Sequence, residues 1–256
     1  MKRFVMVAGV VFFLGLQAQG ASFSAQKIDD LNEVARARDG GQLTPEMRRY
    51  FTIQSASVKL VDDRVYPNGL HKMRGLPALK DPTEPPAGGV LGEANVFIDQ
   101  LINLGKKLWN IVEANRPVVS FADQTASALP RGIESWSELE GWDNPRAKTY
   151  HLTYKNVYGT SVVDFAYRIV YVAGGSYKGQ GKYLAQVTVY PETVSVAWGY
   201  TFDAKVSIPV IMNHGTREAP IAGAEVLVDW TIETPLKSSR STSSYAVRGD
   251  GQLLAL

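Results

Sequence analysis

The stretch TSVVDFAYRIVYVAG, residues 160–174, places apolar side chains on both faces of an extended chain. Its β-branched and aromatic residues favour a strand. A strand that is apolar on both faces is typical of a position covered from two sides. We therefore expect this segment to be a central strand of the fold.

The segments on either side of it alternate between apolar and polar residues. Residues 149–155, 194–202 and 226–232 all show this period of two, which is typical of antiparallel strands with one covered face. In the strand predicted over 194–202, Trp198 is expected to lie in the core. The short segments YGT (158–160) and PET (191–193) predict hairpin turns and hence a meander.

The stretch VAGGSYKGQGKYLAQV, residues 172–187, resembles a phosphate-binding loop in composition only. Such a loop needs a glycine, four residues, Gly-Lys and then Ser or Thr, at a turn from a strand into a helix. Here Gly181-Lys182 is followed by Tyr183 and a strand-like segment, and Ser176 stands where the first glycine is required. The pattern predicts a glycine-rich hairpin.

The segment NVFIDQLINLGKKLWNIVE, residues 95–113, has the strongest helical pattern in the chain. With about 100° between successive residues, its apolar side chains fill one half of the circumference. We predict one long amphipathic helix over residues 94–114, packed on the sheet. The edge that carries Ile98, Ile102 and Trp109 is the candidate surface for a ligand or a partner.

The predicted fold class is mainly β, with α+β as the alternative: an antiparallel meander forming a curved sheet or a β-sandwich, plus this helix. Residues 1–20 are a signal peptide in this interpretation. Residues 21–73 form an N-terminal helical segment and a first strand, with a helix capped by Thr44 and starting at Pro45. Residues 74–92 are a Pro/Gly-rich linker, and residues 93–256 form the helix and the antiparallel β domain.

The N-terminal sequence predicts export. Lys2 and Arg3 precede an apolar run of about 13 residues and then small residues, as in a secretory signal peptide. Cleavage after Gly20 is the expected result, and the intact mass of the exported protein measures it. A mature protein that retains residues 1–20 would contradict this prediction.

Charge and cysteine content restrict the partners and the location. The predicted peptide carries two basic residues and no acidic one, so its removal leaves 25 Lys and Arg against 25 Asp and Glu. A neutral chain has no electrostatic attraction to nucleic acid or to anionic lipid, so we expect neither partner. Because the chain also lacks cysteine, we expect a periplasmic or secreted protein of a Gram-negative bacterium.

The segment IESWSELEGWDNPR, residues 133–146, has the composition of a recognition loop. It combines Trp136 and Trp142 with four acidic residues. Carboxylates beside aromatic rings are used by glycoside hydrolases and sugar-binding proteins. The alternative is a short amphipathic helix whose tryptophans pack on the sheet.

The sequence contains no clear catalytic motif. There are three histidines and no Cys, so no metal site, no cofactor and no catalytic residue are predicted. Arg248-Gly249-Asp250 matches an adhesion tripeptide, but Asp-Gly is also a common hairpin turn, and we expect a turn.

We therefore expect a non-enzymatic binding or structural role in the envelope. The binding partner would be a protein, a second copy of the chain, a small apolar ligand or a glycan. Two alternatives stay open: an envelope-glycan hydrolase or sugar-binding protein that uses residues 134–143, and an outer-membrane β-barrel.

Overall fold

The computed structural model describes residues 43–67, 96–102, 108–113, 116–117 and 126–256, with the backbone alone for 108–113 and 116–117. The chain divides into two compact units, Met1–Arg48 and Arg49–Leu256. The predicted signal peptide and the predicted linker lie outside the described residues.

The first described element is the short helix α2 (Pro45–Tyr50). The amide of Met47 donates a hydrogen bond of 3.2 Å to Oγ1 of Thr44, so Thr44 caps the helix and Pro45 occupies its first position, as predicted. No helix among the described residues is both long and apolar enough to cross a membrane.

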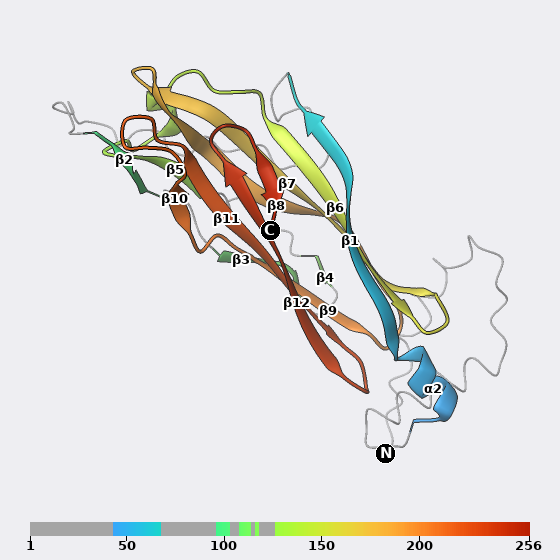
Figure 1. Ribbon diagram of the computed structural model, residues 1–256. Coiled ribbons are helices and arrows are strands. Elements are labelled where there is room, and N and C mark those ends of the chain that lie inside the picture. Colours follow the sequence, from blue (N-terminus) through green and yellow to red (C-terminus); the bar gives the residue numbers. More distant parts are fainter. Residues whose placement is uncertain (1–42, 68–95, 103–107, 114–115, 118–125) are drawn as a thin grey trace, which may run out of the picture. The chain divides into compact units, whose positions relative to one another are not determined.

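The described strands of the second unit form two antiparallel sheets (Figure 1). The first sheet has the order β1–β6–β7–β8–β5–β2, and the second has the order β13–β12–β11–β9–β3–β4, with β10 paired to β11. The strands are β1 (Ile53–Val65), β2 (Phe97–Ile102), β3 (Leu108–Glu113), β4 (Arg116–Pro117), β5 (Ala126–Arg131), β6 (Arg146–Asn156), β7 (Ser161–Tyr177), β8 (Gln180–Val196), β9 (Thr201–Ser207), β10 (Ile211–Asn213), β11 (Ala222–Glu233), β12 (Ser238–Arg248) and β13 (Leu253–Ala255). The mainly β, antiparallel prediction is confirmed.

Strand β7 contains the stretch from which the fold was predicted, and it lies inside the first sheet between β6 and β8. The glycine-rich stretch is the β7–β8 hairpin: Tyr177 pairs with Gln180, and Gly179 has a φ of 74°, which glycine adopts without strain. The interpretation as a hairpin is confirmed.

The core lies where the inner faces of the two sheets meet. Tyr167 of β7 and Tyr245 of β12 share a buried hydrogen bond of 2.5 Å between their hydroxyl groups. Nε1 of Trp230 donates to the hydroxyl of Tyr154 at 2.8 Å. Because these buried polar groups have partners, burying the rings does not leave donors unsatisfied.

The long helix predicted over residues 94–114 is wrong. The described parts of this range are two strands, β2 and β3, and they belong to different sheets. The physical reason is that short apolar runs satisfy a helical pattern as well as a strand pattern. The β-branched Ile98, Ile102 and Ile111 favour strands.

The strand predicted over residues 194–202 is interrupted. Strand β8 ends at Val196, and Gly199 makes a turn with a φ of 78° before β9 starts at Thr201. Trp198 therefore projects from the turn and is 42% exposed, so its predicted burial is wrong. The turn predicted at residues 191–193 is also wrong, because β8 continues through Pro191 beside a register shift, where proline is tolerated.

Candidate functional site

A charged cleft lies where strands of the first sheet meet the turn between β12 and β13. Its volume is about 260 Å³, just below the range typical of sites for drug-sized ligands, so it suits a smaller molecule. We call it the β1–β13 cleft. It is lined by Asp63, Val65, Arg146, Lys148, Tyr171, Gly251, Gln252, Leu253 and Leu254.

The alternation of β6 brings two cations to this cleft. Arg146 and Lys148 are two residues apart, and they continue the face on which Tyr150 and Leu152 are buried. On the neighbouring strand β7, Tyr171 is the partner of Arg146. Two positive side chains thus continue the row that carries the buried Tyr150 and Leu152.

Arg146 has one guanidinium nitrogen without a partner. Its Nη1 donates to the carbonyl oxygen of Gly251 at 3.1 Å, and its Nη2 lies 3.5 Å from Oδ2 of Asp143. Its Nε is buried and has no hydrogen-bond partner. A buried N–H without an acceptor is costly and rare in folded proteins, so this atom calls for an explanation.

Lys148 is held by two oxygen atoms. Its Nζ lies 3.2 Å from Oδ2 of Asp63 on β1 and donates to the carbonyl oxygen of Leu253 at 3.5 Å. The charged side chains that line the cleft are thus two cations and one carboxylate. With Asp143 beside Arg146 and Asp63 beside Lys148, each of the two cations has one carboxylate next to it.

Tyr171 is a neutral, buried part of the cleft wall. Its hydroxyl donates to the carbonyl oxygen of Gly251 at 3.0 Å, the same oxygen that accepts from Arg146. Burial, with smaller contributions from Asp63 and Asp250, raises the pKa of Tyr171 to about 12 against the opposing effect of Arg146. The phenol therefore stays protonated at neutral pH.

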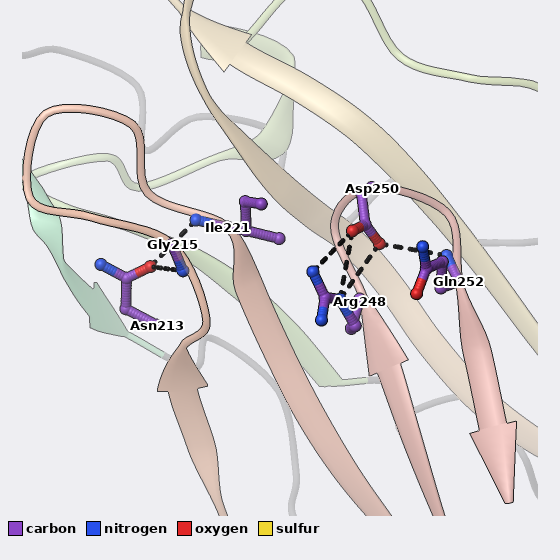
Figure 2. A network of polar contacts seen from close by, with 6 residues as sticks. All are labelled: Asn213, Gly215, Ile221, Arg248, Asp250 and Gln252. Carbon is purple, nitrogen blue, oxygen red and sulfur yellow. Dashed lines mark hydrogen bonds and ion pairs between the residues drawn. The ribbon is translucent and has the colours of Figure 1, made fainter.

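The wall formed by residues 251–254 is fixed by the turn that carries the Arg-Gly-Asp tripeptide. Figure 2 shows Arg248 and Asp250 turned toward each other. Nη2 of Arg248 lies 2.7 Å from Oδ2 of Asp250. Oδ1 of Asp250 also accepts from the amide of Gln252. Both charged side chains are thus used within the turn, as expected for a structural hairpin.

Gly249 fastens this turn to the rest of the second unit. Its amide donates to the carbonyl of Ala222, and its carbonyl accepts from the amide of Gly174. A Cβ at this position would lie 2.1 Å from the carbonyl oxygen of Lys182. Only glycine permits so close an approach.

The residues predicted as a single binding edge are not brought together as one helix face. Ile98 and Ile102 are half-buried on β2, and the carbonyl of Ile98 accepts a 2.9 Å hydrogen bond from the hydroxyl of Tyr183. Trp109 lies on β3 of the other sheet, and its side chain is outside the described residues. None of the three lines the β1–β13 cleft.

Trp136 and Trp142 do lie together. Their rings are 6.5 Å apart at an angle of 76°, and Nε1 of Trp142 donates to the carbonyl of Trp136 at 3.1 Å. The indole of Trp142 also occupies the space beside Gly175, where a Cβ would be 2.3 Å from the ring. These contacts support the interpretation that the tryptophans pack on the sheet.

Two of the four acidic side chains of this segment have structural partners. Glu138 belongs to the short 3-10 helix η3 (Trp136–Glu138), and its Oε1 accepts from the amides of Glu134 and Ser135 in a capping box. Asp143 lies beside Arg146. The glycan hydrolase or sugar-binding alternative stays a prediction.

Sequence reasoning missed the cleft, although a signal for it was present. Lys148 and Arg146 extend the inward-facing row of β6 that carries the buried Tyr150, Leu152 and Tyr154. Charged residues at such positions need a partner or a function. The contributions of Asp63 and of Leu253 could not be found this way, because they come from strands distant in sequence.

Known proteins give no further guide to this site. No protein-family model matches the chain, and neither a curated protein nor a solved structure is significantly similar to it. Within the described part of the chain, no group of three or more His, Asp or Glu side chains is arranged to hold a metal ion.

Proposed function

We propose that this chain is an exported, non-enzymatic binding protein whose β1–β13 cleft takes a small organic anion. The observation that carries this proposal is the buried Nε of Arg146, which has no hydrogen-bond partner and belongs to a side chain that lines the cleft. A carboxylate accepts charge-assisted hydrogen bonds from a guanidinium, and these are stronger than neutral ones.

The cleft also supports a ligand with an apolar part. Val65, Leu253 and Leu254 line it together with the charged groups. A short-chain carboxylate has both the anionic group for Arg146 and a hydrocarbon part for these side chains. Export is also proposed, on the basis of the signal-peptide pattern in the N-terminal sequence.

The test is a titration of the folded protein with butyrate, in which calorimetry measures the binding. We expect butyrate to bind and its neutral amide, butyramide, to bind at least about tenfold more weakly. In the Arg146→Gln variant we expect the affinity for butyrate to fall by about tenfold or more, because the charge-assisted bond is lost.

Arg240→Gln is the matched control. Arg240 is an exposed residue of β12 whose Nη2 lies 3.7 Å from Asp229, and it does not line the cleft. Thermal unfolding of both variants checks that they are folded. Equal affinities for butyrate and butyramide, or equal losses in the two variants, would contradict the proposal.

A further inference from the structure

The outer face of the first sheet, which points away from the second sheet, carries a band of buried side chains. Ala147 of β6 pairs with Val170 of β7, one position along from the inward-facing pair of Arg146 and Tyr171, so both side chains are on the outer face. Val170 is 0% exposed. We call this band the outer band, and its buried members are Ala147, Thr149, Val170, Gln186, Thr188 and Tyr190.

The outer band needs a cover. Its neighbours in the same sheet flank Val170 but leave the end of the side chain open, and the free face of an antiparallel sheet is normally in water. The face is more exposed with distance from the end of β1: the side chains of His151 and Asp164 are 40% and 35% exposed. The cover therefore lies over the part of the face that adjoins Val65, the last residue of β1, which pairs with Arg146.

Tyr66 is the part of this cover that the structure describes. It follows β1 directly, its side chain packs against the apolar cluster of Ala147, Val170 and Tyr190, and its amide donates to the carbonyl of Pro145 at 2.8 Å. The second sheet does not contribute, because it packs on the inner face. The chain thus leaves β1 toward the outer face.

We propose that residues 68–95, which join β1 to β2, cross the outer face of the first sheet and cover the outer band. Strands β1 and β2 are the two edges of this sheet, so the chain between them passes from one edge to the other. Five strand spacings amount to about 24 Å, and a chain of this length reaches several times farther. Because the second sheet occupies the inner face, the outer face is the open route across the sheet.

The chemistry of the outer band also fits a polypeptide. Leu76, Leu79 and Leu91 of the 68–95 segment are apolar, as is the cluster around Val170. Nε2 of Gln186 is buried and has no hydrogen-bond partner. Every residue of a polypeptide offers a carbonyl oxygen to such a group, whereas a hydrocarbon ligand offers no acceptor.

This inference does not depend on the ligand proposed above. Arg146 and Lys148 line the β1–β13 cleft from the inner face, and the outer band lies on the other face of the same strands. A failure to bind butyrate would therefore leave the cover of the outer band unaffected.

Photo-crosslinking from a single cysteine tests the proposal. The chain has no cysteine, so Val172→Cys can be labelled with benzophenone maleimide at one position only. Val172 is half-buried and packs at the margin of the outer band. After irradiation and digestion, mass spectrometry identifies the peptide joined to residue 172. We expect peptides from residues 68–95 to be the main product.

Thr193→Cys is the matched control, because Thr193 is an exposed residue of β8 opposite Ala166, on the same face but outside the outer band. Labelled there, the protein should give no product with residues 68–95. Thermal unfolding checks that both labelled proteins are folded. The proposal is overturned if residue 172 joins mainly to another part of the chain, to a second copy, or to no peptide. Equal yields from the two positions would overturn it as well.

Discussion

Replacing Tyr167 with alanine is expected to lower the free energy of unfolding by about 3–5 kcal/mol, as large aromatic deletions in protein cores do. Tyr167 is fully buried between the sheets and stacks with Tyr150 and Phe165, with ring centroids 5.8 and 5.3 Å apart. It also holds the hydrogen bond to Tyr245. Its removal leaves a cavity and takes away one hydrogen-bond partner of the Tyr245 hydroxyl. Urea denaturation measures the change.

Two further variants separate these effects. Tyr167→Phe keeps the ring and removes only the hydroxyl, so a smaller loss of about 1 kcal/mol is expected. Tyr158→Ala is the control, because Tyr158 is 52% exposed in the turn after β6, and its loss should stay within about 0.5 kcal/mol. Similar losses for Tyr167→Ala and Tyr158→Ala would show that the two sheets do not enclose a shared core.

Raising the pH above 10 is expected to destabilise the folded protein steeply. Burial is the main cause that raises the pKa of Tyr171 and of Tyr183 to about 12, from an ordinary value of 10. The unfolded chain loses these protons near pH 10, whereas the folded chain keeps them. The contribution that each of these two tyrosines makes to the free energy of unfolding is thus complete below pH 10. It falls by about 1.4 kcal/mol per pH unit between pH 10 and about pH 12.

The free energy of unfolding, measured by urea denaturation at a series of alkaline pH values, tests this dependence. In Tyr183→Phe the slope above pH 10 should be shallower by about 1.4 kcal/mol per pH unit. Tyr158→Phe, which removes the hydroxyl of a ring that is 52% exposed, is the matched control. Ionisation of every tyrosine near pH 10 in a protein that stays folded, seen by absorbance, would show that these rings are not desolvated.

The fold was predictable from sequence where a single strand carries its own pattern. The apolar residues of β7 indicated a central strand, and Gly179 marked the hairpin that follows it. The long helix was wrong because Ile98 and Ile111 belong to two short apolar runs, and neither run alone distinguishes a helix from a strand. Strand β2 pairs with β5 and strand β3 pairs with β9, in different sheets. These partners are distant in sequence, so the two runs alone do not reveal that they are strands.

The candidate site was less predictable because it is assembled from separate strands. Arg146 and Lys148 could be recognised as charges on an inward-facing row, but Asp63 is about 80 residues away in the chain and the Leu253 carbonyl about 100. Antiparallel pairing brings β1 to β6, and the turn at Gly249 brings β13 close to them. Neither of these two contacts between distant strands can be recognised from the residue pattern of a single segment.

The most direct measurement is the ¹⁵N–¹H signal of the Arg146 Nε–H group, followed by nuclear magnetic resonance while butyrate is added. Arg146→Gln identifies the signal. We predict that it shifts progressively to saturation with butyrate and stays in place with butyramide, because only the carboxylate supplies a charged acceptor to the buried Nε. The signal of Arg240 should not move. If the Arg146 signal stays unchanged at butyrate concentrations that saturate any binding seen by calorimetry, the cleft is not the binding site and the proposed function is wrong.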